Sequence, residues 1–351
     1  MKITDIQYER LDLKLSEPYT IAYETVSHAT NFILKVETDG KICGYGCAAT
    51  DLEVTGEDPD VVESIIKKQL IPMLKGKNPI CFARVLTELR ELIGRSPSLM
   101  AMTDMALLDI AAKKMEVPLY QYLGGYRHEI PTSITIGILP IDETMRRATE
   151  FVDRGFFIIK LKGGLNPEED IEKIKQLRAK FPDIVLRFDG NQGYTVQEAV
   201  DFVKGVENEG VEIFEQPSKV VQEHNLGLIT EQVDLPVMAD ESLKTLKDAF
   251  RLAQNARIDM INIKLMKVGG IVEAMHINSV AKSAGLEAMV GCIDECSLGI
   301  AAGLHFALSR PNIQYADLDG HLDLLNDPFK NLFILENGIM KPKSLPGLAI
   351  R

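Results

Sequence analysis

The sequence predicts an α/β protein in which a closed parallel barrel of eight strands follows a smaller α+β domain. Three observations support this prediction. From residue 132 onwards, short β-rich segments recur at intervals of roughly 25 residues, helix-like segments separate them, and charged residues stand where the strands end. An open doubly wound sheet is the alternative fold, but it gives no reason for eight such units.

Residues 1–125 are expected to form the α+β domain, because strand-like segments come first and a block of helices follows. Strands are predicted at 2–14 and 30–47, joined by the polar segment EPYTIAYETVSHAT. Apolar residues then recur at helical spacing in DPDVVESIIKKQLIPML, CFARVLTELRELI and SLMAMTDMALLDIAAKKME.

Residues 126–320 are expected to form the barrel. Its strands are predicted at 132–138, 157–162, 185–189, 212–216, 236–240, 260–264, 287–291 and 313–318. Helices are predicted between them, as in PEEDIEKIKQLRAKF and VQEAVDFVKGVENEG. Residues 321–351 are expected to form a hairpin and a tail that return to the first domain. No strand is followed by GxGxxG or GxxxxGK[ST], so the usual dinucleotide and P-loop signals are absent.

The chain has 39 Lys and Arg residues against 51 Asp and Glu residues, a formal net charge of −12. This balance argues against nucleic acid or an anionic membrane as the main partner. The five cysteines form no CxxC pair, which favours reduced thiols over a disulfide framework. The beginning of the sequence lacks the apolar segment of a signal peptide, and nowhere do 18 apolar residues run together. We therefore expect a cytoplasmic protein.

Three carboxylates end consecutive strands of the predicted barrel: Asp189, Glu215 and Asp240. The carboxyl ends of barrel strands meet around one mouth, so these side chains should converge there. Converging carboxylates repel one another unless a cation lies between them, and Mg²⁺ prefers oxygen ligands. The sequence therefore predicts a Mg²⁺ site. The alternative is that these acids cap helices or end solvated loops.

Two lysines, Lys160 and Lys162, lie on the same face of the apolar strand FIIKLKGG, and Lys264 ends a strand roughly opposite. A buried lysine can exchange protons near neutral pH, because burial and nearby cations lower its pKa. We interpret Lys162 and Lys264 as two acid/base groups on opposite faces of a carbon acid. Lys160 is interpreted as a neighbouring charge that also contacts a substrate carboxylate.

A second same-face pair, Asp317 and Asp319, ends the last predicted strand in YADLDG. Two carboxylates in this position can bind a substrate ammonium group. A turn rich in Asp and Gly at the exit of a strand is an equally good explanation of the spacing.

At these residues the chain resembles the enolase superfamily, specifically its muconate-lactonizing subgroup and, within it, the dipeptide epimerases. The resemblance covers essentially the whole length and is carried by KLK, FDGNQGY, EQP, ADES, NIKLMKVGG and DLD. It implies a modified (β/α)₇β barrel with an N-terminal capping domain that the C-terminal tail completes. It also implies a Lys base and Mg²⁺, a small dipeptide as the partner and, we expect, a homo-oligomer.

The resemblance also implies roles for individual residues. Lys162 and Lys264 are the acid/base pair, Lys160 assists, and Asp189, Glu215 and Asp240 hold the metal with Asn191 nearby. Asp317 and Asp319 bind the α-ammonium group of the dipeptide. Thr135 lines the site, and the segment GCIDE, which contains Asp294, flanks the substrate.

One position departs from the family pattern. The loop TIAYETV resembles the capping loop in which L-Ala-D/L-Glu epimerases carry an arginine, but Glu24 stands there in this chain. An acid would repel a glutamate side chain, which argues against Ala-Glu specificity. Glu24, Asp51, Asp294 and Glu295 could instead attract a cationic residue.

The sequence therefore predicts an isomerase, a Mg²⁺-dependent epimerase that inverts the α-carbon of the C-terminal residue of a dipeptide through an enediolate. A rival within the same subgroup is an N-acylamino acid racemase or an o-succinylbenzoate synthase, whose substrates have no free α-ammonium group for Asp317 and Asp319. A rival from another class is a non-catalytic binding or structural protein that keeps the barrel.

Overall fold

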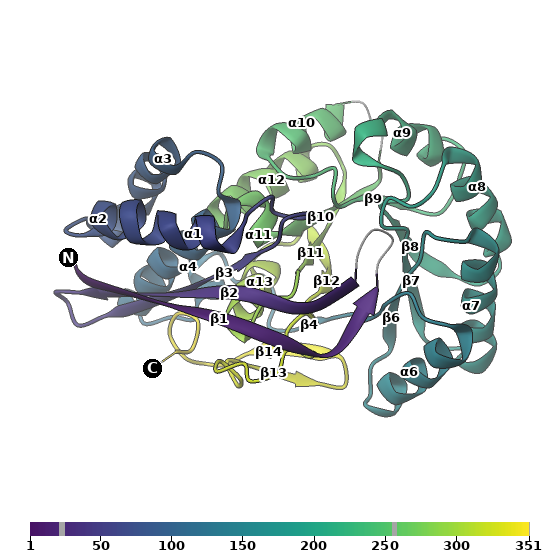
Figure 1. Ribbon diagram of the computed structural model, residues 1–351, viewed down its shortest axis with the longest axis horizontal. Helices are drawn as coiled ribbons and strands as arrows, with labels where there is room; N and C mark the ends of the chain where they lie inside the picture. The colour runs from purple at the N-terminus through teal and green to yellow at the C-terminus, as the bar shows by residue number, and fades with distance from the viewer. Residues whose placement is uncertain (21–24, 255–257, 351) are drawn as a thin grey trace.

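A computed structural model describes residues 1–20, 25–254 and 258–350 of the chain. A three-stranded antiparallel sheet and a group of helices, here called the N-terminal sheet and the N-terminal helices, lie beside an eight-stranded parallel barrel (Figure 1). The N-terminal sheet contains β1 (Ile3–Thr20), β2 (Thr25–Thr38) and β3 (Cys43–Thr50). The N-terminal helical segments are α1 (Pro59–Ile65), the π-helical η1 (Ile66–Leu70), α2 (Ile71–Leu74), the 3₁₀ segment η2 (Pro79–Cys81), α3 (Phe82–Ile93), α4 (Pro97–Lys114) and α5 (Leu119–Tyr122).

The predicted single strand at 30–47 is wrong. This stretch forms two antiparallel strands, β2 and β3, and the sharp turn between them contains Asp39 and Gly40, followed by Lys41 at a φ of 59°. Asp-Gly is a strong signal for a hairpin turn. The apolar residues on both sides of it resemble one long strand, which explains the wrong prediction. The segment predicted as a polar connection is also mostly strand, since β1 continues to Thr20 and β2 begins at Thr25.

Helix α4 lies at the centre of the N-terminal part and is buried along nearly its whole length. Strand β3 packs so closely on it that a Cβ at Gly44 or Gly46 would clash with backbone oxygens of Ala106 and Met102. Asp104 of α4 accepts a hydrogen bond from the backbone N–H of Ile271, at the start of a barrel helix. The helix is therefore tied to both the sheet and the barrel by contacts that leave little freedom.

The barrel has the predicted eight parallel strands, with boundaries that differ from the prediction by at most two residues. They are β5 (Ile134–Ile136), β6 (Ile158–Lys162), β7 (Val185–Asp189), β8 (Val211–Glu215), β9 (Val237–Ala239), β10 (Met260–Lys264), β11 (Glu287–Gly291) and β12 (Ile313–Asp317). Neighbours in sequence are neighbours in the sheet.

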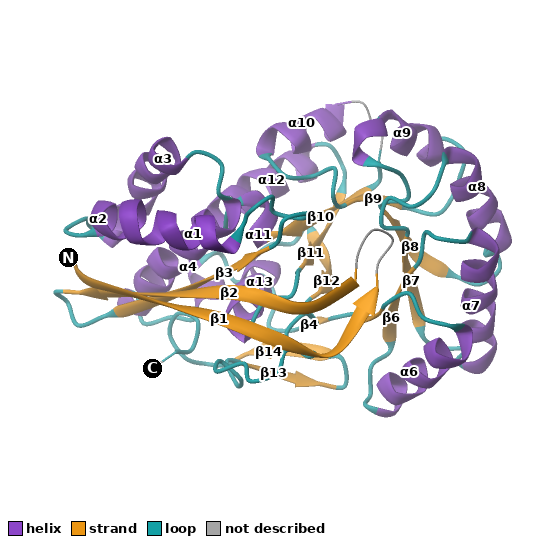
Figure 2. Ribbon diagram, viewed as in Figure 1, coloured by secondary structure: helices purple, strands orange, loops and turns teal. Residues whose placement is uncertain are grey.

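A helix follows each of the first seven barrel strands, and most of these helices lie outside the strands (Figure 2). The helical segments are α6 (Ile141–Asp153), α7 (Pro167–Lys180), α8 (Val196–Gly205), η3 (Val220–Gln222), α9 (His224–Thr230), α10 (Leu246–Gln254), α11 (Leu265–Val268), α12 (Ile271–Ser283) and α13 (Ser297–Ser309). In the part of the chain that the structure describes, β12 has no helix after it, which confirms the (β/α)₇β architecture. None of the described helices is both long and apolar enough to cross a membrane.

The ring closes between its first and last strands through few contacts. Thr132 and Ala316 form an isolated parallel bridge, and the backbone N–H of Ser133 donates to the carbonyl oxygen of Ala316 at 3.1 Å. The backbone N–H of Leu318 donates to Oγ1 of Thr132 at 2.8 Å. The side chain of Thr132 and the backbone of Ser133 therefore help to close the barrel between β5 and β12, where regular strand pairing is absent from the described residues.

The C-terminal segment forms the predicted hairpin from β13 (Phe333–Glu336) and β14 (Ile339–Pro342), which pairs with β4 (Ile130–Pro131). Beyond it, the backbone N–H of Leu348 donates to Oδ1 of Asp109 in α4 at 2.7 Å. The end of the described chain thus contacts the N-terminal helices.

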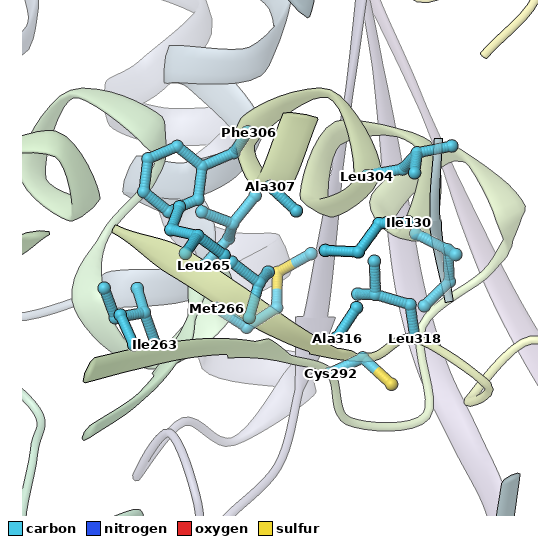
Figure 3. Close-up of a cluster of buried hydrophobic side chains, with 14 of the residues drawn as sticks. Ile130, Ile263, Leu265, Met266, Cys292, Leu304, Phe306, Ala307, Ala316 and Leu318 are labelled. Carbon is cyan, nitrogen blue, oxygen red and sulfur yellow. The ribbon is translucent and has the colours of Figure 1, made fainter. Parts of the chain in front are cut away.

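The core continues from the barrel wall into helix α13. Figure 3 shows Leu304, Phe306 and Ala307 of this helix beside Ile263 of β10 and Ala316 of β12. All five side chains are fully buried. His305, on the same helix, is also buried, and its Nδ1 accepts a hydrogen bond from the backbone N–H of Tyr120 at 2.9 Å. Burial lowers the pKa of His305 from 6.5 to about 3, so the folded protein keeps this imidazole neutral.

His305 makes folding stability depend on pH. Its folded pKa lies below its unfolded pKa, so below about pH 6.5 the unfolded chain binds a proton that the folded protein excludes. Acidification should therefore destabilise the protein, by about 2 kcal/mol between pH 7 and pH 5 from this group. His305→Asn, which keeps an acceptor for Tyr120 but does not titrate, should remove that part of the pH dependence. Urea unfolding of both proteins at several pH values measures the difference; parallel curves would contradict the prediction.

Candidate active site

A pocket opens at the carboxyl ends of the barrel strands, and the end of β1 contributes to its wall. Seven of the predicted site residues line it: Thr135, Lys160, Lys162, Lys264, Asp294, Asp317 and Asp319. Asp189, Glu215 and Asp240 are 1%, 1% and 2% exposed and contact the lining lysines. Glu24 lies outside the described residues.

Strand register brings these side chains to one level. Lys162 pairs with Asp189, and Asp189 pairs in turn with Glu215, on the adjacent strands β6, β7 and β8. On the other side of the ring, Lys264 of β10 pairs with Gly291 of β11, which pairs with Asp317 of β12. Strands β6 and β10 stand four places apart in a ring of eight, so Lys162 and Lys264 approach the mouth from opposite sides.

Lys160 is the centre of the charge network. Its Nζ lies 2.6 Å from Oε2 of Glu215, 3.1 Å from Oδ2 of Asp189 and 3.0 Å from Oδ2 of Asp317. Burial alone would lower the pKa of Lys160, but these three carboxylates raise it well above its usual range. Lys160 is therefore a permanent cation that balances charge.

The other two predicted lysines differ in their surroundings. Nζ of Lys264 lies 2.7 Å from Oδ2 of Asp240, and although burial opposes it, this carboxylate raises the pKa of Lys264. Nζ of Lys162 lies 3.9 Å from Oδ2 of Asp189 and 6.0 Å from the centre of the Tyr19 ring. In the described part of the chain Lys162 has one ion-pair partner, 3.9 Å away, and its side chain is 16% exposed, so it is the freer of the two amines.

The two aspartates after β12 have separate surroundings. Asp317 accepts hydrogen bonds from Oγ of Ser133 at 2.6 Å and from Nζ of Lys160 at 3.0 Å. Oδ2 of Asp319 accepts from the backbone N–H of Thr135 at 2.6 Å. Burial, and then the charge of Asp317, raises the pKa of Asp319 to about 7. Among the described residues, Asp319 therefore has no ion-pair partner, whereas Asp317 has Lys160.

The residues predicted to read the substrate side chain are only partly brought together. Asp294 lines the pocket and its Oδ2 accepts from the Tyr19 hydroxyl at 2.9 Å. Glu295 is 2% exposed and its Oε1 accepts from the backbone N–H of Ile293, so it does not face the pocket. Oδ1 of Asp51 accepts from the backbone N–H of Val54 in a turn.

Sequence reasoning missed several polar residues that support the site. Nζ of Lys267 binds Asp240, and Nδ2 of Asn262 donates to Oε1 of Glu215 at 2.7 Å. Asn262 shares a strand face with Lys264, two residues on, so strand alternation could have found it. Tyr19 and Asn31 reach the site from the N-terminal sheet, 275 and 263 residues before Asp294, and nothing in the local sequence indicates their contacts.

The donor set suits a hard divalent cation. Among the described residues, no group of three or more Asp, Glu, His or Cys side chains is arranged to hold a metal ion, and amines lie against the carboxylates of Glu215 and Asp240. Four buried oxygens at the site nevertheless have no hydrogen-bond partner among the described residues: Oδ1 of Asn191, Oε2 of Glu241, Oδ1 of Asn262 and Oδ2 of Asp189, the last of which lies 3.1 Å from Nζ of Lys160. Oxygen-only donors with unpaired atoms fit Mg²⁺ better than a transition metal.

Comparison with known proteins gives the family. The mandelate racemase / muconate lactonizing enzyme N-terminal domain matches residues 5–124, and the enolase C-terminal domain-like family matches residues 143–351. An L-Lys-D/L-Arg epimerase from Desulforapulum autotrophicum is 42% identical over 354 residues, 100% of this chain and 99% of the relative.

Two solved structures are similar over nearly their whole length. The L-Ala-D/L-Glu epimerase from Bacillus subtilis, in a substrate-liganded complex, has a TM-score of 0.96 and 36% identity, covering 99% of this chain and 98% of that one. The dipeptide epimerase from Methylococcus capsulatus, complexed with Mg and L-Arg-D-Lys, has a TM-score of 0.95 and 35% identity, covering 99% of each chain.

The fold and these relatives define an isomerase. More particularly, the chain belongs to the enolase superfamily, in its muconate-lactonizing subgroup. The enzyme class and the family both confirm the expectations from the sequence.

The contacts of Lys160 predict a large stability effect. Lys160→Met should destabilise the protein without added metal by about 3–5 kcal/mol, because it leaves three buried carboxylates without their shared cation. Lys162→Met is the matched control, with one ion pair at 3.9 Å, and should cost about 1 kcal/mol or less. Urea unfolding in EDTA measures both. Equal losses would show that Lys160 does not hold the carboxylates together.

Proposed function

We propose that the protein is a Mg²⁺-dependent dipeptide epimerase that inverts the α-carbon of the C-terminal residue and prefers cationic dipeptides. The observation that carries this proposal is the placement of Lys162 and Lys264 on opposite strands of the ring, both lining one pocket. Two amines that face a carbon from opposite sides can remove a proton from one face and return a proton to the other.

The buried acids supply the second requirement. Asp189, Glu215 and Asp240 would hold Mg²⁺, with Asn191 and Glu241 nearby. When bound, the ion would offset both the charge that develops as the α-proton leaves and the carboxylate charge that raises the pKa of Lys264. Lys160 would bind the substrate carboxylate from its own side, since its charge is permanent.

The ends of the substrate would be distinguished by charge. Asp319, which has no ion-pair partner in the part of the chain that the structure describes, would bind the α-ammonium group together with Asp317, next to Thr135. The described residues that line the pocket include five acids (Glu17, Asp294, Asp317, Asp319 and Asp323) and four cations (Arg147, Lys160, Lys162 and Lys264), and Arg147 is itself paired with Glu17. This excess of acids supports a cationic substrate, as do relatives named L-Lys-D/L-Arg epimerase.

A panel of substrates in D₂O tests the function. Dipeptides ending in Lys or Arg should gain one deuterium at the C-terminal α-carbon with Mg²⁺ and none after EDTA treatment, read by mass spectrometry. Ala-Glu should exchange more slowly, because acids outnumber cations among the described residues that line the pocket. Faster exchange with Ala-Glu would refute the cationic preference. Faster exchange with N-acylamino acids would favour the racemase reading, and no exchange with any member would favour a non-catalytic barrel.

The two-lysine mechanism predicts one-sided variants. Lys162→Ala and Lys264→Ala should each lower epimerisation by about 10²–10⁴-fold, the usual contribution of a positioned acid/base group. Each variant should still exchange deuterium into the one epimer whose α-proton faces the remaining lysine, which chiral analysis of the recovered dipeptide detects. Full epimerisation by either variant, or two-sided exchange, would refute the assignment.

A further inference from the structure

A buried amide in the N-terminal sheet contacts the loop that carries Asp294. Asn31 lies in β2 and is 0% exposed. Its Nδ2 donates to the carbonyl oxygen of Asp294 at 3.1 Å, and its Oδ1 accepts from the backbone N–H of Cys296 at 2.8 Å. The two backbone groups fix the orientation of the amide, because a carbonyl only accepts and an N–H only donates.

A third contact reinforces this one. Sγ of Cys47, on the neighbouring strand β3, donates to the same Oδ1 of Asn31 at 3.4 Å and lies 3.5 Å from Sγ of Cys296. Cys47 and Cys296 are both 0% exposed. The loop at 292–296 is thus held against the N-terminal sheet by three polar contacts that exclude water.

These contacts hold two consecutive peptide groups, the one before Glu295 and the one after it. If Asn31 were removed, the carbonyl of Asp294 and the N–H of Cys296 would be left buried without partners, and burial without a hydrogen bond is costly. The loop would then turn these groups towards water and carry the Asp294 side chain with it. The hydroxyl of Tyr19, which binds the Asp294 carboxylate, comes from the same sheet but cannot replace the backbone contacts.

We infer that Asn31 is a positioning residue that holds the Asp294 carboxylate towards the pocket and so sets the choice among C-terminal side chains. The inference rests on the proposed epimerase function. According to this inference, a buried residue of the N-terminal sheet contributes to the substrate specificity of the pocket. Asn31 does not line the pocket and need not touch the substrate.

Two substrates that differ only at the C-terminal residue test this inference. We would measure kcat and KM for L-Lys-L-Lys and L-Lys-L-Leu with Asn31→Ala. The preference for L-Lys-L-Lys in kcat/KM should fall about fivefold, mainly through KM. This is the effect of losing one hydrogen bond between the Asp294 carboxylate and the substrate side chain. Asn31→Ser, which keeps one of the contacts, should give a smaller loss and serves if Asn31→Ala does not fold.

Asn278→Ala is the matched control. Asn278 is a buried amide on α12 whose Oδ1 accepts from Nδ2 of Asn312 at 3.2 Å, away from the pocket. Its loss should reduce stability without changing the preference. In an Asp294→Asn background, Asn31→Ala should have no further effect on the preference, since Asn31 acts through Asp294.

The outcomes separate this inference from the function it rests on. An unchanged preference in the Asn31 variants, with a wild-type protein that epimerises both dipeptides, overturns the inference and leaves the function intact. A changed preference in the Asn31 variants, with the preference unchanged in Asn278→Ala, supports it. A wild-type protein that epimerises neither dipeptide overturns the proposed function and the inference with it.

Discussion

The active-site mouth depends on one electrostatic constraint: the buried charges that strand register brings together must balance. Parallel pairing places Asp189, Glu215 and Asp317 around Lys160, and none of these side chains is more than a few per cent exposed. In the low-dielectric interior of the protein, carboxylates without a nearby cation would be strongly destabilising. The lysines are therefore needed to stabilise the folded protein, in addition to their proposed role in catalysis. Any cation that enters must compete with amines already bound to its ligands.

The barrel and its charged mouth could be predicted because both follow from short-range patterns. Segments that repeat once per βα unit fix the strands, and a strand end fixes the position of Asp189 or Lys264. One error was local: the Asp-Gly turn between β2 and β3 lies between apolar segments that resemble one strand, and it was overlooked. The other depends on tertiary structure: Glu295 was expected near the substrate, but it is 2% exposed and does not line the pocket.

The N-terminal sheet and the barrel meet through buried polar contacts as well as apolar packing. Asp104 of α4 binds the backbone at the start of α12, and Asn31 of β2 binds the loop after β11. Such contacts are directional, so they fix the relative orientation of the two parts more tightly than hydrophobic contact would. No local sequence pattern reveals them, because each residue acts on a partner more than 150 positions away.

The seam between β5 and β12 bears on how the protein is made. Thr132 and Ser133 bind residues 316–318, and β4 pairs with β14. Strand β5 can therefore pair with β6 early, but the partners on its other side, and the partner of β4, are among the last segments translated. A ribosome-bound chain holds an unclosed ring with exposed edges, the kind of intermediate that invites misassociation. Asp317, which closes the ring and completes the charged mouth, arrives when nine-tenths of the chain has emerged, so a truncated product would have no assembled site.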